Sequence, residues 1–190
     1  GLTEFIPISS SGHLVVAQNF LAGASNHLFL EWINIGTMLA LVVYFWRRII
    51  TIIVDITKRR RYRLARNILL TSIPAGIVGY VAADFIERSD FFGSIIVVAA
   101  MLTVVGVIMI VLERLPKASA VKDGEALTIP RALLIGVAQM VALIPGTSRS
   151  GSTIITGRLL GLSAKNAAEY SFLASLPIMA GVTAKVFLHD

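Results

Sequence analysis

The sequence predicts an all-α membrane protein, a polytopic helix bundle with two re-entrant helical hairpins related by an inverted-topology repeat. Three observations lead to this fold class. Of the 190 residues, 56% are hydrophobic and only 15% are charged, which is too apolar for an ordinary soluble domain. Long apolar runs alternate with short charged segments. Two similar motifs of small polar residues interrupt the apolar sequence, one near each end of the chain.

Four near-continuous apolar runs of about 16 to 21 residues each predict transmembrane helices, because a hydrocarbon core of about 30 Å needs about 20 residues. The runs are Phe29–Trp46, Ile68–Ala83, Phe92–Leu112 and Ala168–Leu188. A fifth run, Leu133–Ile144, is shorter. As a helix of about 12 residues it would rise only about 18 Å. The chain should therefore turn back inside the membrane after this run.

The distribution of charge predicts the orientation of the spans. The segment Arg47–Arg66 is expected to be a loop, and it carries eight basic residues and one acidic residue. The positive-inside rule places such a loop in the cytoplasm. The cluster Arg59–Arg63 could instead bind nucleic acid or anionic lipid headgroups, but its position beside a span already explains its charge. No nucleic-acid partner is expected.

The two motifs align when the sequence is shifted by 138 positions without a gap. The matched pairs are Pro7 with Pro145, Ser9 with Thr147, Ser10 with Ser148, Leu21–Ser25 with Leu159–Ser163, and Glu31 with Glu169. Chance similarity of two turns is the alternative, but the single register favours an internal duplication. Three predicted crossings separate the copies, so the copies should be inverted relative to each other. We expect one membrane domain, 1–190, with repeat 1 at about 1–53 and repeat 2 at about 133–190.

Both motifs have the chemistry of an anion site. In each, a proline is followed by hydroxyl residues and glycine before apolar residues resume, a pattern typical of a helix N-cap. Two helix N-termini that meet would offer free N–H groups and partial positive charge to an anion. Arg149 adds donors suited to phosphate oxygens. The candidate binding residues are Ser9, Ser11, Gly12, Gly146, Thr147, Ser148, Ser150, Gly151 and Thr153.

Three residues of the first motif add possible catalytic chemistry. Ser10 and His13 are three positions apart, so on a helix they would share a face and could act as nucleophile and base. Glu4 could orient His13, act as an acid or base, or hold a divalent cation. Structural alternatives remain open: helix capping for the serines, a hydrogen-bonded core position for His13, and an ion pair with Arg149 for Glu4. Three further polar residues could line a cavity or bond neighbouring helices: Asn34, Gln139 and Arg158.

The motif segments Gly1–His13 and Pro145–Thr153 closely resemble the two signature motifs of the bacterial undecaprenyl-diphosphate phosphatase family, the bacitracin-resistance type. The similarity extends over essentially all 190 residues. It implies a hydrolase of the bacterial inner membrane that converts undecaprenyl diphosphate to undecaprenyl phosphate and inorganic phosphate, and so recycles the lipid carrier of cell-wall peptidoglycan synthesis. It also implies dependence on a divalent cation, Mg²⁺ or Ca²⁺, and an active site that faces the periplasm.

The resemblance also implies roles for individual residues. Ser10 matches the proposed nucleophile, His13 the motif histidine, and Arg149 the diphosphate-binding arginine. Glu4 matches the second acidic residue of the first motif and is the candidate metal ligand. The family's other acidic position would precede Gly1, and about two more helices would follow the last residue. We therefore expect a fragment that is truncated at both ends.

A rival function uses the same anion site without hydrolysis. Inverted repeats with broken helices are common in secondary carriers, so a lipid-phosphate transporter or flippase is the alternative. The spacing of Ser10 and His13 favours hydrolysis, because simple binding does not need it. The expected partners are a polyprenyl diphosphate lipid and the bilayer, and a homodimer is left open.

Overall fold

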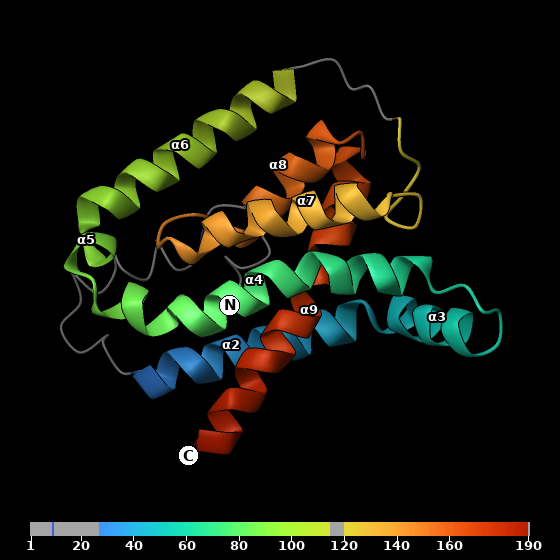
Figure 1. Ribbon diagram of the computed structural model, residues 1–190, viewed down its shortest axis with the longest axis horizontal. Coiled ribbons are helices and arrows are strands. Elements are labelled where there is room, and N and C mark those ends of the chain that lie inside the picture. The colour runs from blue at the N-terminus through green and yellow to red at the C-terminus, as the bar shows by residue number, and fades with distance from the viewer. Residues whose placement is uncertain (1–8, 10–26, 115–119, 190) are drawn as a thin grey trace.

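The computed structural model describes residues 9, 27–114 and 120–189, and this part of the chain is all-α (Figure 1). Its helices are α2 (His27–Tyr44), α3 (Trp46–Thr57), α4 (Arg63–Arg88), α5 (Asp90–Gly93), α6 (Ile95–Arg114), α7 (Ile129–Met140), η2 (Val141–Leu143), α8 (Arg149–Leu159) and α9 (Ala164–His189). The predicted all-α class is confirmed. Most of the first motif lies outside the described residues, so the first hairpin and the inverted repeat stay predictions.

Two helices are long and apolar enough to cross a membrane, and they confirm the second and third predicted spans. They are Arg63–Ala82 within α4 and Ile95–Arg114, which is α6. The short helix α5 joins them at one end of the molecule, and the two helices run in opposite directions along its long axis (Figure 1). This axis is the direction in which the chain would cross a bilayer.

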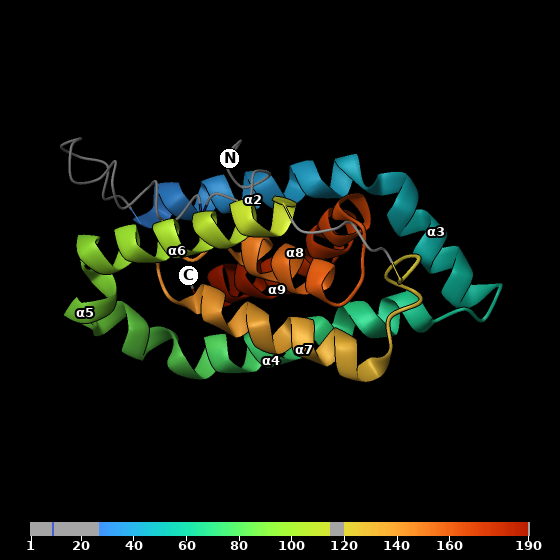
Figure 2. The same cartoon turned by 90° about the horizontal axis from the view of Figure 1, so that it is seen from above.

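The first predicted span bends instead of ending in a loop. Helix α2 covers most of it, but the chain turns by 68° near Phe45 and continues as α3 (Figure 2). The prediction of a loop over Arg47–Arg66 is therefore wrong for residues 47–57, which belong to α3 (Trp46–Thr57), and for residues 63–66, which begin α4. The positive-inside rule indicates a side of the membrane but carries no information about local structure. The apolar residues of α3 recur with a helical period, and that period decides the conformation.

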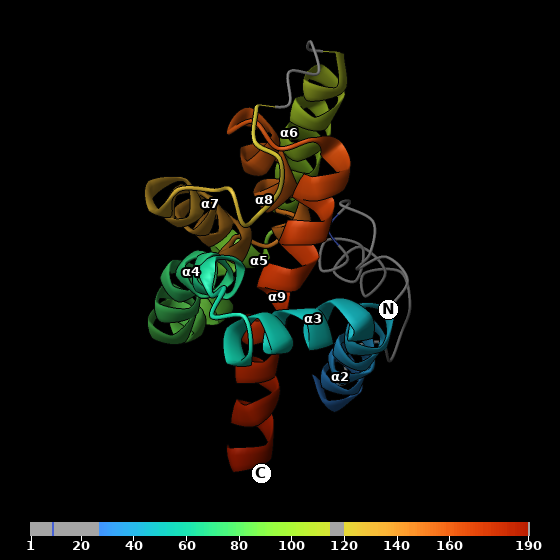
Figure 3. The same cartoon turned by 90° about the vertical axis from the view of Figure 1, so that its right-hand side faces the viewer.

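Helix α9 occupies the fourth predicted span, with Pro177 inside it. It crosses the neighbouring helices at a steep angle instead of running parallel to them (Figures 1 and 3). Among the described residues, the helices apolar enough to span a membrane do not include it. The fourth crossing therefore stays a prediction.

The segment around the second motif forms a short helical hairpin. Helix α7 has 12 residues and α8 has 11, and η2 and a turn join them. Such helices rise about 18 and 17 Å, well short of a bilayer core of about 30 Å. The start of α7 and the end of α8 lie toward the same end of the molecule (Figure 1). The predicted hairpin is present, and its depth in a bilayer stays a prediction.

Buried polar contacts fix this hairpin against α4. Asn67 of α4 is fully buried, and its amide nitrogen donates hydrogen bonds of 2.9 Å to the carbonyl oxygens of Gly124 and Leu127. A Cβ added to Gly136 of α7 would lie 2.6 Å from the carbonyl oxygen of Thr71, so the two helices approach at backbone distance. The α7 arm of the hairpin is thus held against α4.

Candidate functional site

The turn that precedes α8 is built around a glycine. Gly146 has a φ of +90°, which side chains disfavour. A Cβ at this position would lie 2.5 Å from the carbonyl oxygen of Val98 in α6. The amide of Thr147 closes the turn with a 3.0 Å hydrogen bond to the carbonyl oxygen of Ile144. The turn is therefore seated directly on the backbone of α6.

Helix α8 begins as the sequence predicts. Ser148 is the N-cap, and its Oγ accepts a 3.0 Å hydrogen bond from the backbone N–H of Gly151. Arg149 is the first residue of the helix, so its guanidinium group adds to the partial positive charge at the N-terminus. The Oγ atoms of Ser148 and Ser150 lie 3.2 Å apart. Cap and arginine together form an electropositive helix end.

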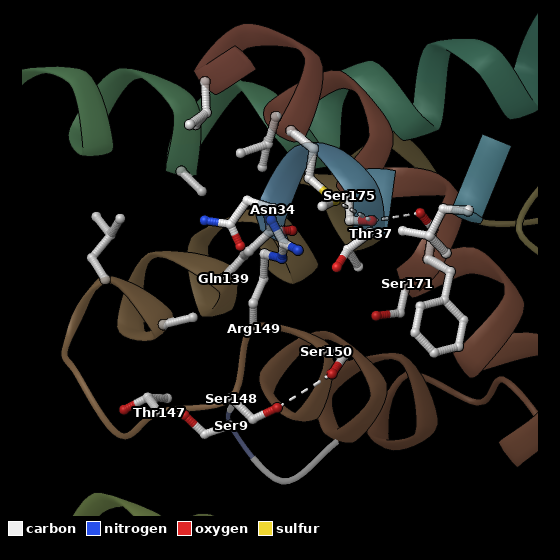
Figure 4. Close-up of a pocket in the computed structure, with 18 of the residues that line it drawn as sticks. Ser9, Asn34, Thr37, Gln139, Thr147, Ser148, Arg149, Ser150, Ser171 and Ser175 are labelled. Atoms are coloured by element: carbon white, nitrogen blue, oxygen red, sulfur yellow. Dashed lines mark hydrogen bonds between the residues drawn. The ribbon is translucent and has the colours of Figure 1, made fainter. Parts of the chain in front are cut away.

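This helix end faces a cavity of about 320 Å³ between α2, the hairpin and α9. Its polar lining consists of Ser9, Asn34, Thr37, Gln139, Thr147, Ser148, Arg149, Ser150, Ser171, Ser175 and Thr183, and Figure 4 labels the first ten. Among the described lining residues, Arg149 is the one charged side chain. A cavity lined by one cation and many hydrogen-bonding groups suits an anion.

Ser9, a residue of the first motif, lies next to residues of the second motif. It is 4% exposed, lines the cavity, and lies beside Thr147 and Ser148 in Figure 4. Its φ of 57° costs a residue with a side chain about 1 to 2 kcal/mol, so the surrounding structure holds it in place. The predicted meeting of the two motifs is thus seen at this one residue. The other predicted residues of the first motif lie outside the described residues: Glu4, Ser10, Ser11, Gly12 and His13.

Not every predicted binding residue of the second motif lines the cavity. Thr147, Ser148, Arg149 and Ser150 do, whereas Gly146, Gly151 and Thr153 do not. The two glycines allow close packing, since a Cβ at Gly151 would lie 2.9 Å from that of Ser148. The hydroxyl of Thr153 is hydrogen-bonded to that of Ser171 and so ties α8 to α9. These three residues therefore support the cavity wall without lining the cavity.

Two buried polar atoms at the cavity have no hydrogen-bond partner within the described part of the chain. They are Nε2 of Gln139, whose side chain is 2% exposed, and Oγ1 of Thr147, which is 3% exposed. A buried donor without a partner costs about 1 to 3 kcal/mol. Figure 4 shows Arg149 extending toward Gln139 and Asn34. A bound anion would give the amide of Gln139 the partner that it lacks.

The sequence did not decide whether three polar residues line a cavity or bond neighbouring helices, and the structure shows where each lies. Asn34 and Gln139 line the cavity. Arg158 does not line it, and its Nη1 instead forms a 2.9 Å ion pair with Glu113.

Sequence reasoning missed four polar lining residues: Thr37, Ser171, Ser175 and Thr183. The spacing of the first three could have identified them. Asn34 and Thr37 are three residues apart, and Ser171 and Ser175 are four apart, so each pair shares one face of an otherwise apolar helix.

The described lining fits an anion better than a cation. Across residues 9, 27–114 and 120–189, no group of three or more histidine, cysteine or acidic side chains is placed to hold a metal ion. Hydroxyl, amide and guanidinium groups suit phosphate, whereas Mg²⁺ and Ca²⁺ prefer carboxylate oxygens. The candidate carboxylate is that of Glu4, so the predicted cation remains untested.

Comparison with known proteins identifies similar sequences along the whole chain. The sequence model of the family described as bacitracin resistance protein BacA matches residues 1–190. The chain is 39% identical over 186 residues to undecaprenyl-diphosphatase 1 of Mesorhizobium japonicum, covering 97% of this chain and 69% of that protein. It is 41% identical over 184 residues to undecaprenyl-diphosphatase of Pseudomonas syringae pv. tomato, covering 95% and 66%. For undecaprenyl-diphosphatase 1 of Clostridioides difficile the identity is 41% over 193 residues, covering 97% and 69%. The chain thus spans about two thirds of the length of these relatives.

Proposed function

Because this chain belongs to the BacA family of bacitracin resistance proteins, we propose that it is an integral membrane undecaprenyl-diphosphatase. The reaction is hydrolysis of undecaprenyl diphosphate to undecaprenyl phosphate and inorganic phosphate. The observation that carries the proposal is the family match over residues 1–190, a range that includes every residue that lines the cavity. Bacitracin resistance and supply of the lipid carrier for cell-wall synthesis follow from this activity.

The cavity supplies what phosphoryl transfer needs most, which is positioning and neutralisation of negative charge. Arg149 at the start of α8 would bind oxygens of the diphosphate, with hydroxyl groups of Ser148 and Ser150 beside it. The amide of Gln139 would donate to the same group.

In this proposal Ser10 is the nucleophile or positions the attacking water, and His13 carries the proton. Ser10 directly follows Ser9 in the sequence, and Ser9 lines the cavity. A divalent cation bound near Glu4 would neutralise further charge on the phosphate oxygens.

The apolar part of the lining accounts for a lipid substrate. Its members are Leu41, Ala75, Ala142, Leu143, Phe172, Ile178, Met179 and Val182. Val182 is 54% exposed, so the apolar wall continues to the outside of the helix bundle. An isoprenoid chain could follow this wall from the bilayer while its diphosphate enters the polar part.

The position of the cavity supports access from the periplasm. The basic segment after α3 lies at one end of the molecule, and the turn before α8 lies toward the opposite end (Figure 1). If the basic end is cytoplasmic, the tip of the hairpin points to the outer face. We place the protein in the bacterial inner membrane with its active site on that side.

The test is phosphate release from undecaprenyl diphosphate by the full-length protein in detergent. We expect Arg149→Ala to lower the rate by about 100-fold or more, because it removes donors to charge that develops in the transition state. Arg158→Ala is the matched control, since Arg158 lies on the same helix but pairs with Glu113 outside the cavity. Near wild-type rates for Arg149→Ala would contradict the proposal. Movement of lipid phosphate across vesicles without phosphate release would favour the transporter.

A further inference from the structure

Helix α3 has an unusual distribution of side chains for a helix at the edge of a bundle. Seven of its 12 residues are apolar, and none of the 12 is buried. The apolar residues are Trp46, Ile49, Ile50, Ile52, Ile53, Val54 and Ile56. At 100° per residue they occupy an arc of about 200°, and Arg47, Arg48, Thr51 and Asp55 share the opposite side. The helix is strongly amphipathic.

The apolar side of α3 is exposed. Trp46 is 56% exposed, Ile50 42%, Ile53 52% and Ile56 42%. An exposed stripe of this kind on one helix marks a surface that something covers, since single exposed apolar residues are ordinary but contiguous ones are not.

Part of the polar side of α3 faces the protein: Arg48 and Asp55 are half-buried, whereas Arg47 and Thr51 are exposed. Arg47, Arg48 and Thr51 line a second cavity, of about 610 Å³, together with Lys122 and Glu169. The Nε of Arg48 lies 2.9 Å from Oε1 of Glu169 in α9. A helix of a soluble protein would turn its apolar side inward. In α3, Ile52 packs against the core but Trp46, Ile50, Ile53 and Ile56 remain exposed, which indicates an apolar surrounding on that side.

The segment also carries an excess of positive charge. Residues 46–63 include seven basic residues and one acidic residue. Asp55 pairs with Arg59 at 3.1 Å, and Arg48 pairs with Glu169. Within the described chain, the five remaining cations have no ion-pair partner: Arg47, Lys58, Arg60, Arg61 and Arg63. Basic residues beside an exposed apolar stripe are complementary to a bilayer surface that contains anionic lipid.

The orientation of α3 fits such a surface. Figure 3 looks along the long axis of the molecule, so that α2 and α4 are seen nearly end-on while α3 lies across the view. If α4 crosses the bilayer, α3 lies roughly in the plane of the membrane. We propose that α3 is an interfacial helix that binds the anionic phospholipid surface, with its isoleucine side in the acyl boundary and its basic residues among the headgroups. This anchor fixes the end of α2, whose Asn34 and Thr37 line the first cavity.

Depth measurements on the intact protein test the orientation. The chain has no cysteine, so single spin labels can be placed at Ile53→Cys and Thr51→Cys in vesicles of phosphatidylcholine and phosphatidylglycerol. We expect the label at position 53 to contact oxygen about 5 to 10 Å below the headgroups, and the label at position 51 to contact a water-soluble relaxation agent. Three results would overturn the proposal: a label at the bilayer centre, equal exposure of both labels to water, or strong coupling between labels of two protein copies.

A second measurement tests the preference for anionic lipid. In a Trp32→Phe background, Trp46 is the sole tryptophan, and its fluorescence reports quenching by brominated lipids. Brominated phosphatidylglycerol should quench it more than brominated phosphatidylcholine does. Arg60→Gln should lower this preference by up to about five-fold, the equivalent of about 1 kcal/mol per basic residue. Arg88→Gln, at the far end of α4, is the control and should leave it unchanged. Equal quenching by both lipids, or no effect of Arg60→Gln, would refute the binding.

Discussion

Two buried amide side chains of this protein are predicted to respond to the same substitution with opposite changes in stability. Gln139 is 2% exposed and its Nε2 has no partner in the described structure, whereas Asn67 is fully buried and its amide nitrogen makes two hydrogen bonds. Replacement by leucine removes the polar group in each case. The consequence depends on whether that group was paired.

For Gln139→Leu we expect a gain of about 1 to 3 kcal/mol in the free energy of unfolding, because a buried donor without a partner is removed. Activity should fall at the same time. A hydrogen bond to a charged phosphate contributes about 1.5 to 3 kcal/mol, which corresponds to about 10- to 100-fold in kcat/KM. Higher stability with lower activity is typical of a group that the fold retains for its ligand.

Asn67→Leu is the matched control. It leaves the carbonyl oxygens of Gly124 and Leu127 without their donor, so we expect a loss of about 2 kcal/mol or more. Thermal unfolding in detergent would detect both changes, since about 1 kcal/mol shifts the midpoint by about 2 to 4 °C in chains of this size.

Two outcomes for Gln139→Leu would contradict these expectations. If Gln139→Leu keeps the wild-type kcat/KM for undecaprenyl diphosphate, its amide does not contact the substrate. If it also lowers the unfolding midpoint, the amide is paired in the folded protein.

Three further predictions concern the same site. Gly146→Ala should lower both stability and the rate of phosphate release, because its Cβ would lie 2.5 Å from the Val98 carbonyl oxygen, whereas Gly106→Ala on α6 meets nothing within 4 Å and should be neutral in both assays. Ser148→Ala should cost about 1 kcal/mol of stability through loss of the cap, while Ser148→Asp should keep the cap but repel the phosphate, raising KM with little change in the unfolding midpoint. Chelation of divalent cations should abolish phosphate release by the wild type, and Glu4→Gln should raise the cation concentration needed for half-maximal rate; activity that survives chelation would contradict the predicted metal.

The second hairpin was predictable because its signals are local. A run too short to cross the bilayer, a proline and glycine at a turn, and hydroxyl residues before a helix each act within a few residues. The hydroxyl-rich motif opens a helix, as the sequence predicts, and the structure identifies Ser148 as the cap and Arg149 as the first helical residue. The two spans in α4 and α6 follow from composition alone.

The features that escaped prediction depend on contacts distant in sequence. The polar lining contributed by α2 and α9 becomes a site only when those helices face the hairpin, and the steep crossing of α9 is a packing outcome. Helix α3 was missed for another reason. Its basic residues dominated the interpretation as a loop, although its isoleucines already had a helical period.

The described part of the cavity has one charged side chain, but its surroundings strengthen the attraction that this side chain would exert on an anion. Arg149 stands at the N-terminus of α8, where backbone N–H groups add partial positive charge. Around it are further polar groups, such as the unpartnered amide of Gln139 and the neighbouring hydroxyls of Ser148 and Ser150. These dipoles are held by a hairpin seated on the backbones of α4 and α6, so they need little reorganisation when charge develops on the substrate.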